Sequence, residues 1–106
     1  MANRSPNGQN AHCKGIYREA YYLVKNGWHV MADHIPGFSS PPEIEGFTPD
    51  IYAIKAESTY ILEIETSNSD DSEQHDAFRR YAKNFRNILF YGWIVDEAGC
   101  RVMKFE

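Results

Sequence analysis

Acidic residues in the middle of the chain have a spacing that suits a metal ion. Asp50 follows Pro49, and Glu63 and Glu65 come thirteen and fifteen residues after Asp50, in the run TYILEIET. Alternate side chains of a strand point to the same face, so Glu63 and Glu65 share one face with Ile61. Neighbouring carboxylates repel one another unless a cation lies between them. Hard oxygen ligands of this kind suit Mg²⁺ or Mn²⁺, which makes these acids candidate metal ligands.

A predicted β-hairpin brings Asp50 to the same face. Residues 50–55 (DIYAIK) and 59–66 are both typical of strands, and a short turn connects them. A four-residue loop sets Asp50 opposite Glu63, whereas a two-residue loop would set Asp50 opposite Glu65. In both registers the three carboxylates share a face, because even loop lengths preserve the alternation of side chains. The sequence therefore predicts that these carboxylates converge at one site.

Two more polar residues lie on the apolar sides of predicted helices. Glu19 comes three residues after Ile16 and four before Leu23, which places it on or beside the apolar stripe. A carboxylate there either reaches the edge of the core or joins the strand acids. Gln74 lies four residues before Phe78, on the sheet-facing side of its helix. Both are candidate site residues.

Positive charge is concentrated on the same predicted helix as Gln74. Its remaining face carries four basic residues, Arg79, Arg80, Lys83 and Arg86. The whole chain has 11 Lys and Arg against 15 Asp and Glu, a formal net charge of −4, which excludes a generally basic nucleic-acid binder but not a local patch. The four residues are therefore candidate phosphate contacts, and the alternative is an ordinary solvated helix face.

The elements that must position these residues follow from apolar spacing and from the places of glycine and proline. Residues 1–11 are polar and are predicted to be a flexible arm, with a single domain over residues 12–106. The predicted order is helix 12–26, strands 28–35, 50–55 and 59–66, helix 72–87, and strands 88–95 and 101–105. This order is typical of a small α/β domain with one mixed sheet. Residues 36–49 hold four of the five prolines, and this long connection is either a functional flap or a cover for a hydrophobic edge.

Composition narrows the class of protein further. At 106 residues, with 42% apolar and 14% aromatic residues, the chain has room for one core and is not a low-complexity disordered segment. Its two cysteines, Cys13 and Cys100, do not make a disulfide framework. No apolar run is long enough to span a membrane and the first residues lack a signal peptide, so we expect a soluble cytoplasmic protein. Tyr17, Tyr21 and Tyr22 are expected to pack within the domain or to form the contacts of a homodimer.

The acidic residues also carry a family resemblance. Pro49-Asp50, followed by Glu63-Ile64-Glu65, resembles the signature of the PD-(D/E)XK nuclease superfamily, in the variant with Glu in place of the motif Lys. The predicted order of elements, α-β-β-β-α-β, is similar to the core of that superfamily. Its members include restriction endonucleases, archaeal-type Holliday-junction resolvases and RecB-like nuclease domains.

The resemblance covers residues 12–95 and implies a restriction-endonuclease-like fold. It also implies a Mg²⁺- or Mn²⁺-dependent endonuclease that hydrolyses phosphodiester bonds, with DNA as the expected substrate. In that case Asp50 and Glu63 would hold the cation, and Glu65 would bind a second metal or act as a base. Gln74 lies where many members have a glutamine, and Glu19 corresponds to an acid on the preceding helix.

Two departures from the family pattern leave other functions open. Glu65 stands where most members have lysine, and neither Lys55 nor Lys83 is placed to replace it. Phe78 stands where a Q-x-x-x-Y motif would have its tyrosine. The alternative is therefore a catalytically inactive nuclease fold that serves as a nucleic-acid-binding or regulatory module. A metal-dependent hydrolase of another small phosphoester is a third alternative.

Overall fold

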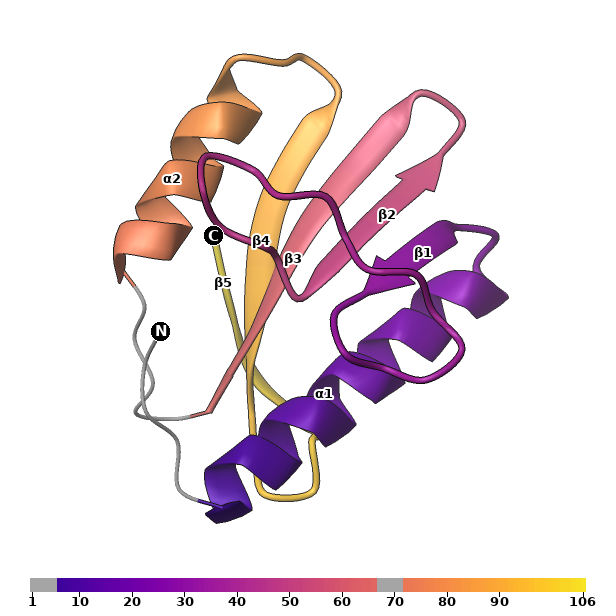
Figure 1. Cartoon of the computed structure of the whole chain (residues 1–106), viewed down its shortest axis with the longest axis vertical. Coiled ribbons are helices and arrows are strands. Elements are labelled where there is room, and N and C mark those ends of the chain that lie inside the picture. Colours follow the sequence, from indigo (N-terminus) through magenta and orange to yellow (C-terminus); the bar gives the residue numbers. More distant parts are fainter. Residues whose placement is uncertain (1–5, 67–71) are drawn as a thin grey trace.

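The computed structural model describes residues 6–66 and 72–106, which form one sheet and two helices (Figure 1). In chain order the elements are α1 (Pro6–Lys25), β1 (His29–Ala32), β2 (Ile51–Lys55), β3 (Ser58–Thr66), α2 (Ser72–Lys83), β4 (Ile88–Val95) and β5 (Arg101–Phe105). The strands lie in the order β1-β2-β3-β4-β5, with β3 and β4 parallel and the other neighbours antiparallel. Of the helices in these two ranges, neither has the length and apolar character needed to cross a membrane. The predicted α/β class with one mixed sheet is confirmed.

The β2–β3 hairpin has one of the two predicted registers. Ile54 pairs with Thr59, which is the register predicted with a four-residue loop. Lys55 and Ser58 also pair, so only two residues remain in the turn. Continued toward the start of β2, this register sets Asp50 opposite Glu63, and the Asp50 backbone N–H donates to the Glu63 carboxylate. The alternative that set Asp50 opposite Glu65 is wrong.

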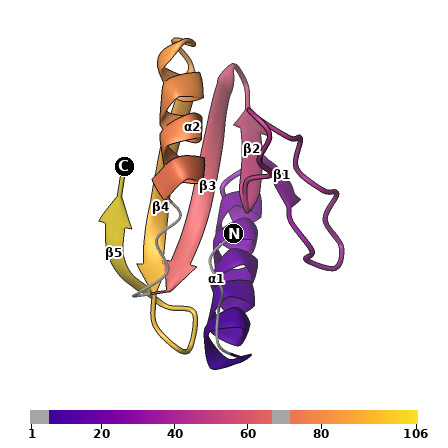
Figure 2. The same ribbon diagram turned by 60° about the vertical axis from the view of Figure 1, so that its left-hand side comes forward.

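The two helices cover opposite faces of the sheet (Figure 2). α1 packs against β1 and β3, and its residues Ile16 and Leu23 share a core cluster with Ile64 of β3. α2 packs mainly against β4, and its residue Phe78 shares a second cluster with Ile61 of β3. Alternate residues of β3 therefore face different helices, and both faces of this strand are buried.

α1 begins earlier than predicted. The helix starts at Pro6, so residues 6–11 of the predicted arm are helical, and residues 1–5 lie outside the described residues. Proline fits the first turn of a helix because an N–H at that position would have no intrahelical acceptor. Ala11 and His12 are both buried, so the helix already contacts the domain before residue 13.

Two other elements end earlier than predicted. α2 ends at Lys83 instead of residue 87, because the N–H groups of Asn84 and Phe85 bond to carbonyls three residues earlier and tighten the chain into a turn. β1 ends at Ala32 instead of residue 35, because His34 adopts a left-handed conformation with φ of 57° that turns the chain away from the sheet. Neither change alters the order of the strands.

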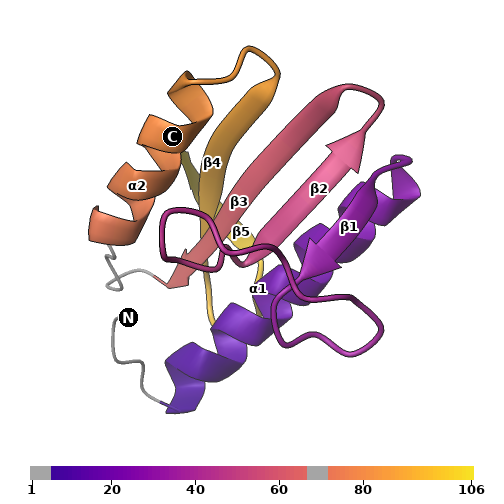
Figure 3. The ribbon, with the colours of Figure 1, turned by 45° about the horizontal axis from the view of Figure 1, so that its top comes forward.

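The proline-rich connection, residues 36–49, contacts the core on both faces of the sheet (Figure 3). Phe38 packs against the cluster of α1, and the later part of the segment lies on the α2 face. Ile44 and Phe47 pair with each other through backbone hydrogen bonds, and both pack in the cluster of Phe78. Ile44 is 5% exposed. This segment therefore supplies a hydrophobic cover, which is one of the two roles predicted for it.

Candidate metal centre

Glu63 lies at the centre of the candidate site. It is in the second half of β3, on the α2 face, and is 1% exposed. One carboxylate oxygen accepts a hydrogen bond from the Asp50 backbone N–H (2.8 Å), and the other accepts one from Gln74 Nε2 (2.5 Å). Gln74 thus lies beside the strand acids, because it shares the sheet-facing side of α2 with Phe78.

The environment of Glu63 opposes a negative charge. Its burial raises the pKa of the Glu63 carboxyl well above the ordinary value, and the negative charge of Asp50 raises this pKa further. The charge of Glu65 acts in the same direction, while the hydrogen bonds from Asp50 and Gln74 partly offset the rise. Without a cation, an ionised Glu63 is therefore a net cost to the folded state.

The metal-free protein is expected to lose stability as the pH rises above the ordinary carboxyl range. A carboxyl whose pKa is raised in the folded chain stabilises the fold while protonated, and this contribution is lost as the pH rises through the folded-state pKa. For each proton bound only in the folded state, the free energy of unfolding falls by about 1.4 kcal/mol per pH unit between the unfolded-state and folded-state pKa values. Urea unfolding in EDTA should show that Glu63→Gln becomes progressively more stable than wild type as the pH rises above the ordinary carboxyl range. A difference that does not change with pH would contradict the raised pKa.

The Asp50 carboxylate contacts His12, which is not among the residues predicted for the site. Its Oδ2 accepts a hydrogen bond from the Ile64 backbone N–H (2.8 Å) and lies 3.1 Å from His12 Nε2. Asp50 and His12 are both buried. His12 lies four residues before Ile16, so the helical spacing that identified the core of α1 also indicated that His12 faces the sheet.

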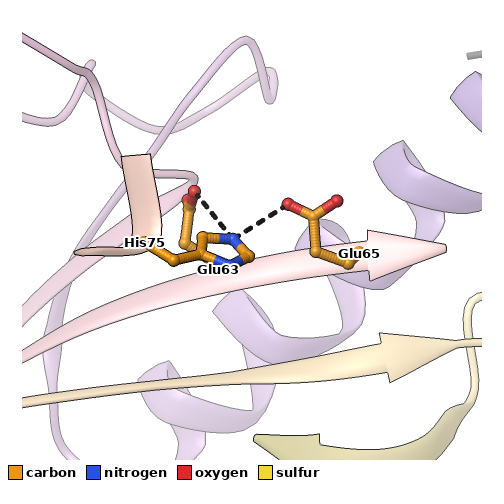
Figure 4. A group of neighbouring side chains, drawn as sticks. All are labelled: Glu63, Glu65 and His75. Atoms are coloured by element: carbon orange, nitrogen blue, oxygen red, sulfur yellow. Dashed lines mark hydrogen bonds and ion pairs between the residues drawn. The ribbon is translucent and has the colours of Figure 1, made fainter. Parts of the chain in front are cut away.

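The Glu65 carboxylate contacts a second histidine, His75, which is also not among the predicted site residues. His75 Nε2 lies 3.2 Å from Glu65 Oε1 and 3.8 Å from Glu63 Oε1 (Figure 4). One ligand atom from each of the three residues can be chosen so that all lie within 4.8 Å of one another, and all three side chains are buried. His75 lies three residues before Phe78, so helical spacing indicated that it faces the sheet.

Aromatic rings hold the imidazole of His75 in place. The centroid of its ring lies 5.9 Å from that of Phe90 and 5.0 Å from that of Phe105. Phe105 can approach β4 because residue 92 is glycine: a Cβ at Gly92 would overlap the Phe105 ring and lie 2.6 Å from the Glu63 carbonyl oxygen. The absent side chain at position 92 thus makes room for the ring that packs against His75.

Glu19 does not join the strand acids, and the expectation that it lies near them is wrong. It projects from α1, on the opposite face of the sheet from α2, and forms a bidentate ion pair with Arg101 of β5. The Arg101 guanidinium also stacks on the rings of Trp93 and Tyr22. Glu19 is therefore a buried partner of β5, and the sheet separates it from Glu63.

The four basic residues near α2 do not form one uniform face. Arg79 donates to Asp76 (3.0 Å) and to the backbone carbonyl of Glu106 (2.9 Å). Arg80 and Lys83 are exposed on α2, and Arg86 is exposed beyond the end of the helix. Contact between these residues and nucleic acid stays a prediction.

Comparison of the chain with protein families, with curated proteins and with solved structures finds no match. The functional argument therefore depends on the geometry of the site. The buried carboxylates of Glu63 and Glu65 and the buried imidazole of His75 lie close together. Asp50 contacts Glu63 through its backbone N–H, while its own carboxylate binds the Ile64 N–H and lies beside His12. Such a donor set fits a divalent cation, because carboxylate oxygen and imidazole nitrogen are both common ligands of divalent metals in proteins.

Proposed function

We propose that this protein is a divalent-metal-dependent nuclease that hydrolyses phosphodiester bonds, with DNA as its substrate. The observation that supports the proposal best is the carboxylate of Glu63, 1% exposed and close to the charges of both Asp50 and Glu65. Burying like charges together costs free energy, and a cation that neutralises them removes that cost. The hairpin that carries these acids, with Gln74 on the next helix, also keeps the arrangement that resembles PD-(D/E)XK nucleases.

Each residue has a defined part in this proposal. A bound cation supplies Lewis acidity toward the phosphate and lowers the pKa of a bound water. Asp50 and Glu63 hold the cation, and the hydrogen bond from Gln74 orients Glu63. Glu65 accepts the proton of the attacking water or holds a second cation. The water oxygen bonds to phosphorus, one phosphorus–oxygen ester bond breaks, and the leaving alkoxide takes up a proton from solvent water.

A second candidate function is a binding module that has lost catalysis. One observation favours it: the carboxylates of Asp50 and Glu63 already accept hydrogen bonds from within the domain, as residues kept for structure would. The net charge of −4 and the absence of the motif lysine point the same way. This alternative retains nucleic-acid binding but neither requires a metal nor cleaves.

Cleavage assays separate the two functions. The purified protein is offered single-stranded, duplex and branched DNA, and RNA, with Mg²⁺ and Mn²⁺ in turn. We expect cleavage of DNA that stops in EDTA and falls at least about a hundredfold in Asp50→Asn, which removes a negative ligand but keeps the side-chain volume. If wild type cuts no substrate and Asp50→Asn binds nucleic acid equally well, the binding module replaces the nuclease.

A further inference from the structure

His75 adds a nitrogen donor to a site for which the sequence predicts only oxygen donors. Its side chain is 6% exposed, and its Nε2 faces the Oε1 atoms of Glu65 and Glu63 at 3.2 Å and 3.8 Å. Figure 4 shows the imidazole between the two carboxylates, with Nε2 directed toward both. The three residues come from two elements, β3 and α2, that pack against each other.

The spacing of these atoms suits a single ion. Donor atoms that bind a first-row metal at about 2.0–2.2 Å lie about 3 Å apart when they occupy adjacent coordination positions. The separation of 3.2 Å between His75 and Glu65 is close to that value, and 3.8 Å between His75 and Glu63 exceeds it by less than an ångström. The carboxylate oxygens of Glu63 and Glu65 lie within 4.8 Å of one another, so both carboxylates would have to rotate toward a common ion for all three donors to bind it.

The residues packed around His75 restrict rotation of its imidazole ring. Phe90 and Phe105 contact the imidazole, and the backbone of α2 fixes its Cα. Turning Nε2 away from the carboxylates would require the ring to move within this aromatic packing. The nitrogen is consequently preorganised, which raises the affinity of an ion that accepts nitrogen.

Nitrogen and oxygen donors select different ions. Mg²⁺ is held by oxygen ligands and keeps several waters, whereas divalent ions of the first transition row also bind nitrogen donors, with affinity that rises from Mn²⁺ to Cu²⁺. One divalent ion would also offset the charges of the two carboxylates of Glu63 and Glu65. We propose that Glu63, Glu65 and His75 form one mixed oxygen–nitrogen site, and that this site prefers a first-row transition-metal dication of the Mn²⁺ to Zn²⁺ group over Mg²⁺. This inference rests on the metal-binding part of the proposed function, in the form in which Glu65 is a metal ligand and not the base.

Spectroscopy of the intact protein with Mn²⁺ tests the inference directly. Pulsed electron paramagnetic resonance detects nitrogen bound to Mn²⁺, and replacing ¹⁴N by ¹⁵N in all histidines identifies that nitrogen as imidazole. We expect histidine nitrogen coupling in wild type, and at least about tenfold tighter calorimetric binding of Mn²⁺ than of Mg²⁺. Because these measurements use wild type, they decide the question even if a variant fails to fold. Absence of histidine coupling, or equal affinity for the two ions, overturns the inference.

Variants assign the nitrogen to one residue. In His75→Gln the coupling should disappear and Mn²⁺ affinity should fall at least about tenfold, with a much smaller change for Mg²⁺. His29→Gln is the matched control, because His29 is exposed on β1, and it should behave as wild type. Coupling that persists in a folded His75→Gln assigns the nitrogen to another histidine and overturns the inference. Mn²⁺ bound through His75 without any cleavage would contradict the nuclease proposal alone.

Discussion

Glu63→Gln is expected to abolish metal-dependent cleavage while leaving the fold intact. The substitution removes a carboxylate that feels the charges of both Asp50 and Glu65, and that is a ligand both in the Asp50–Glu63 site and in the Glu63–Glu65–His75 site proposed above. Metal polarisation of phosphate contributes several kcal/mol to transition-state stabilisation, so kcat/KM should fall at least about a thousandfold. Steady-state cleavage with saturating Mn²⁺, together with calorimetric titration of the ion, measures both effects.

The hydrogen bonds around Glu63 allow this substitution. Two donors, the Asp50 N–H and Gln74 Nε2, point at the carboxylate. An introduced amide can accept from Asp50 with its oxygen and donate its NH₂ to Gln74, provided that the Gln74 side chain turns its own oxygen inward. The metal-free variant should therefore be at least as stable as wild type at neutral pH. Unchanged cleavage by Glu63→Gln would contradict the proposed role of Glu63.

The matched control for this prediction is Glu57→Gln. Glu57 is exposed in the turn between β2 and β3, so the same chemical change there removes a negative charge outside the site. Cleavage, ion affinity and pH dependence should all equal those of wild type. A comparable loss in the control would indicate that net charge, and not the carboxylate at position 63, controls the activity.

Glu65→Lys is expected to abolish cleavage, with a loss of at least about a hundredfold. Glu65 Oε1 lies 3.2 Å from His75 Nε2, so its carboxylate faces the same space that an ion would occupy. An ammonium introduced on this strand position would lie close to Glu63 and take the place of the cation. Because the new charge neutralises Glu63, the metal-free variant should also be more stable than wild type at neutral pH.

Glu65→Gln separates loss of a ligand from gain of a positive charge. It should reduce cleavage as well, but it should stabilise the metal-free protein less than Glu65→Lys does. Unfolding curves in EDTA and cleavage with Mg²⁺ and Mn²⁺ give the comparison. If Glu65→Lys preserves or increases cleavage, Glu65 is an inactive replacement of the motif lysine, and the metal site is limited to the remaining ligands.

The sequence by itself determined which residues share a face. The alternation of β3 sends Glu63 and Glu65 to the side opposite Leu62 and Ile64, because successive side chains of a strand point in opposite directions. The spacing of apolar residues and the places of glycine and proline predicted the α/β order, and one of the two predicted hairpin registers sets Asp50 opposite Glu63. Such properties depend only on neighbours along the chain.

The tertiary structure alone decided which distant residue meets each acid. Glu19 has the same helical position whether it joins the acids or not, and its partner Arg101 is 82 residues away. His75 lies close to both Glu63 and Glu65. This position depends on how α2 packs against β4 and on how Phe105 fills the space left by Gly92. Periodicity specifies the direction in which a side chain leaves its own element. The packing of elements far apart in the chain specifies what it meets, because those contacts are settled by the free energy of the whole core.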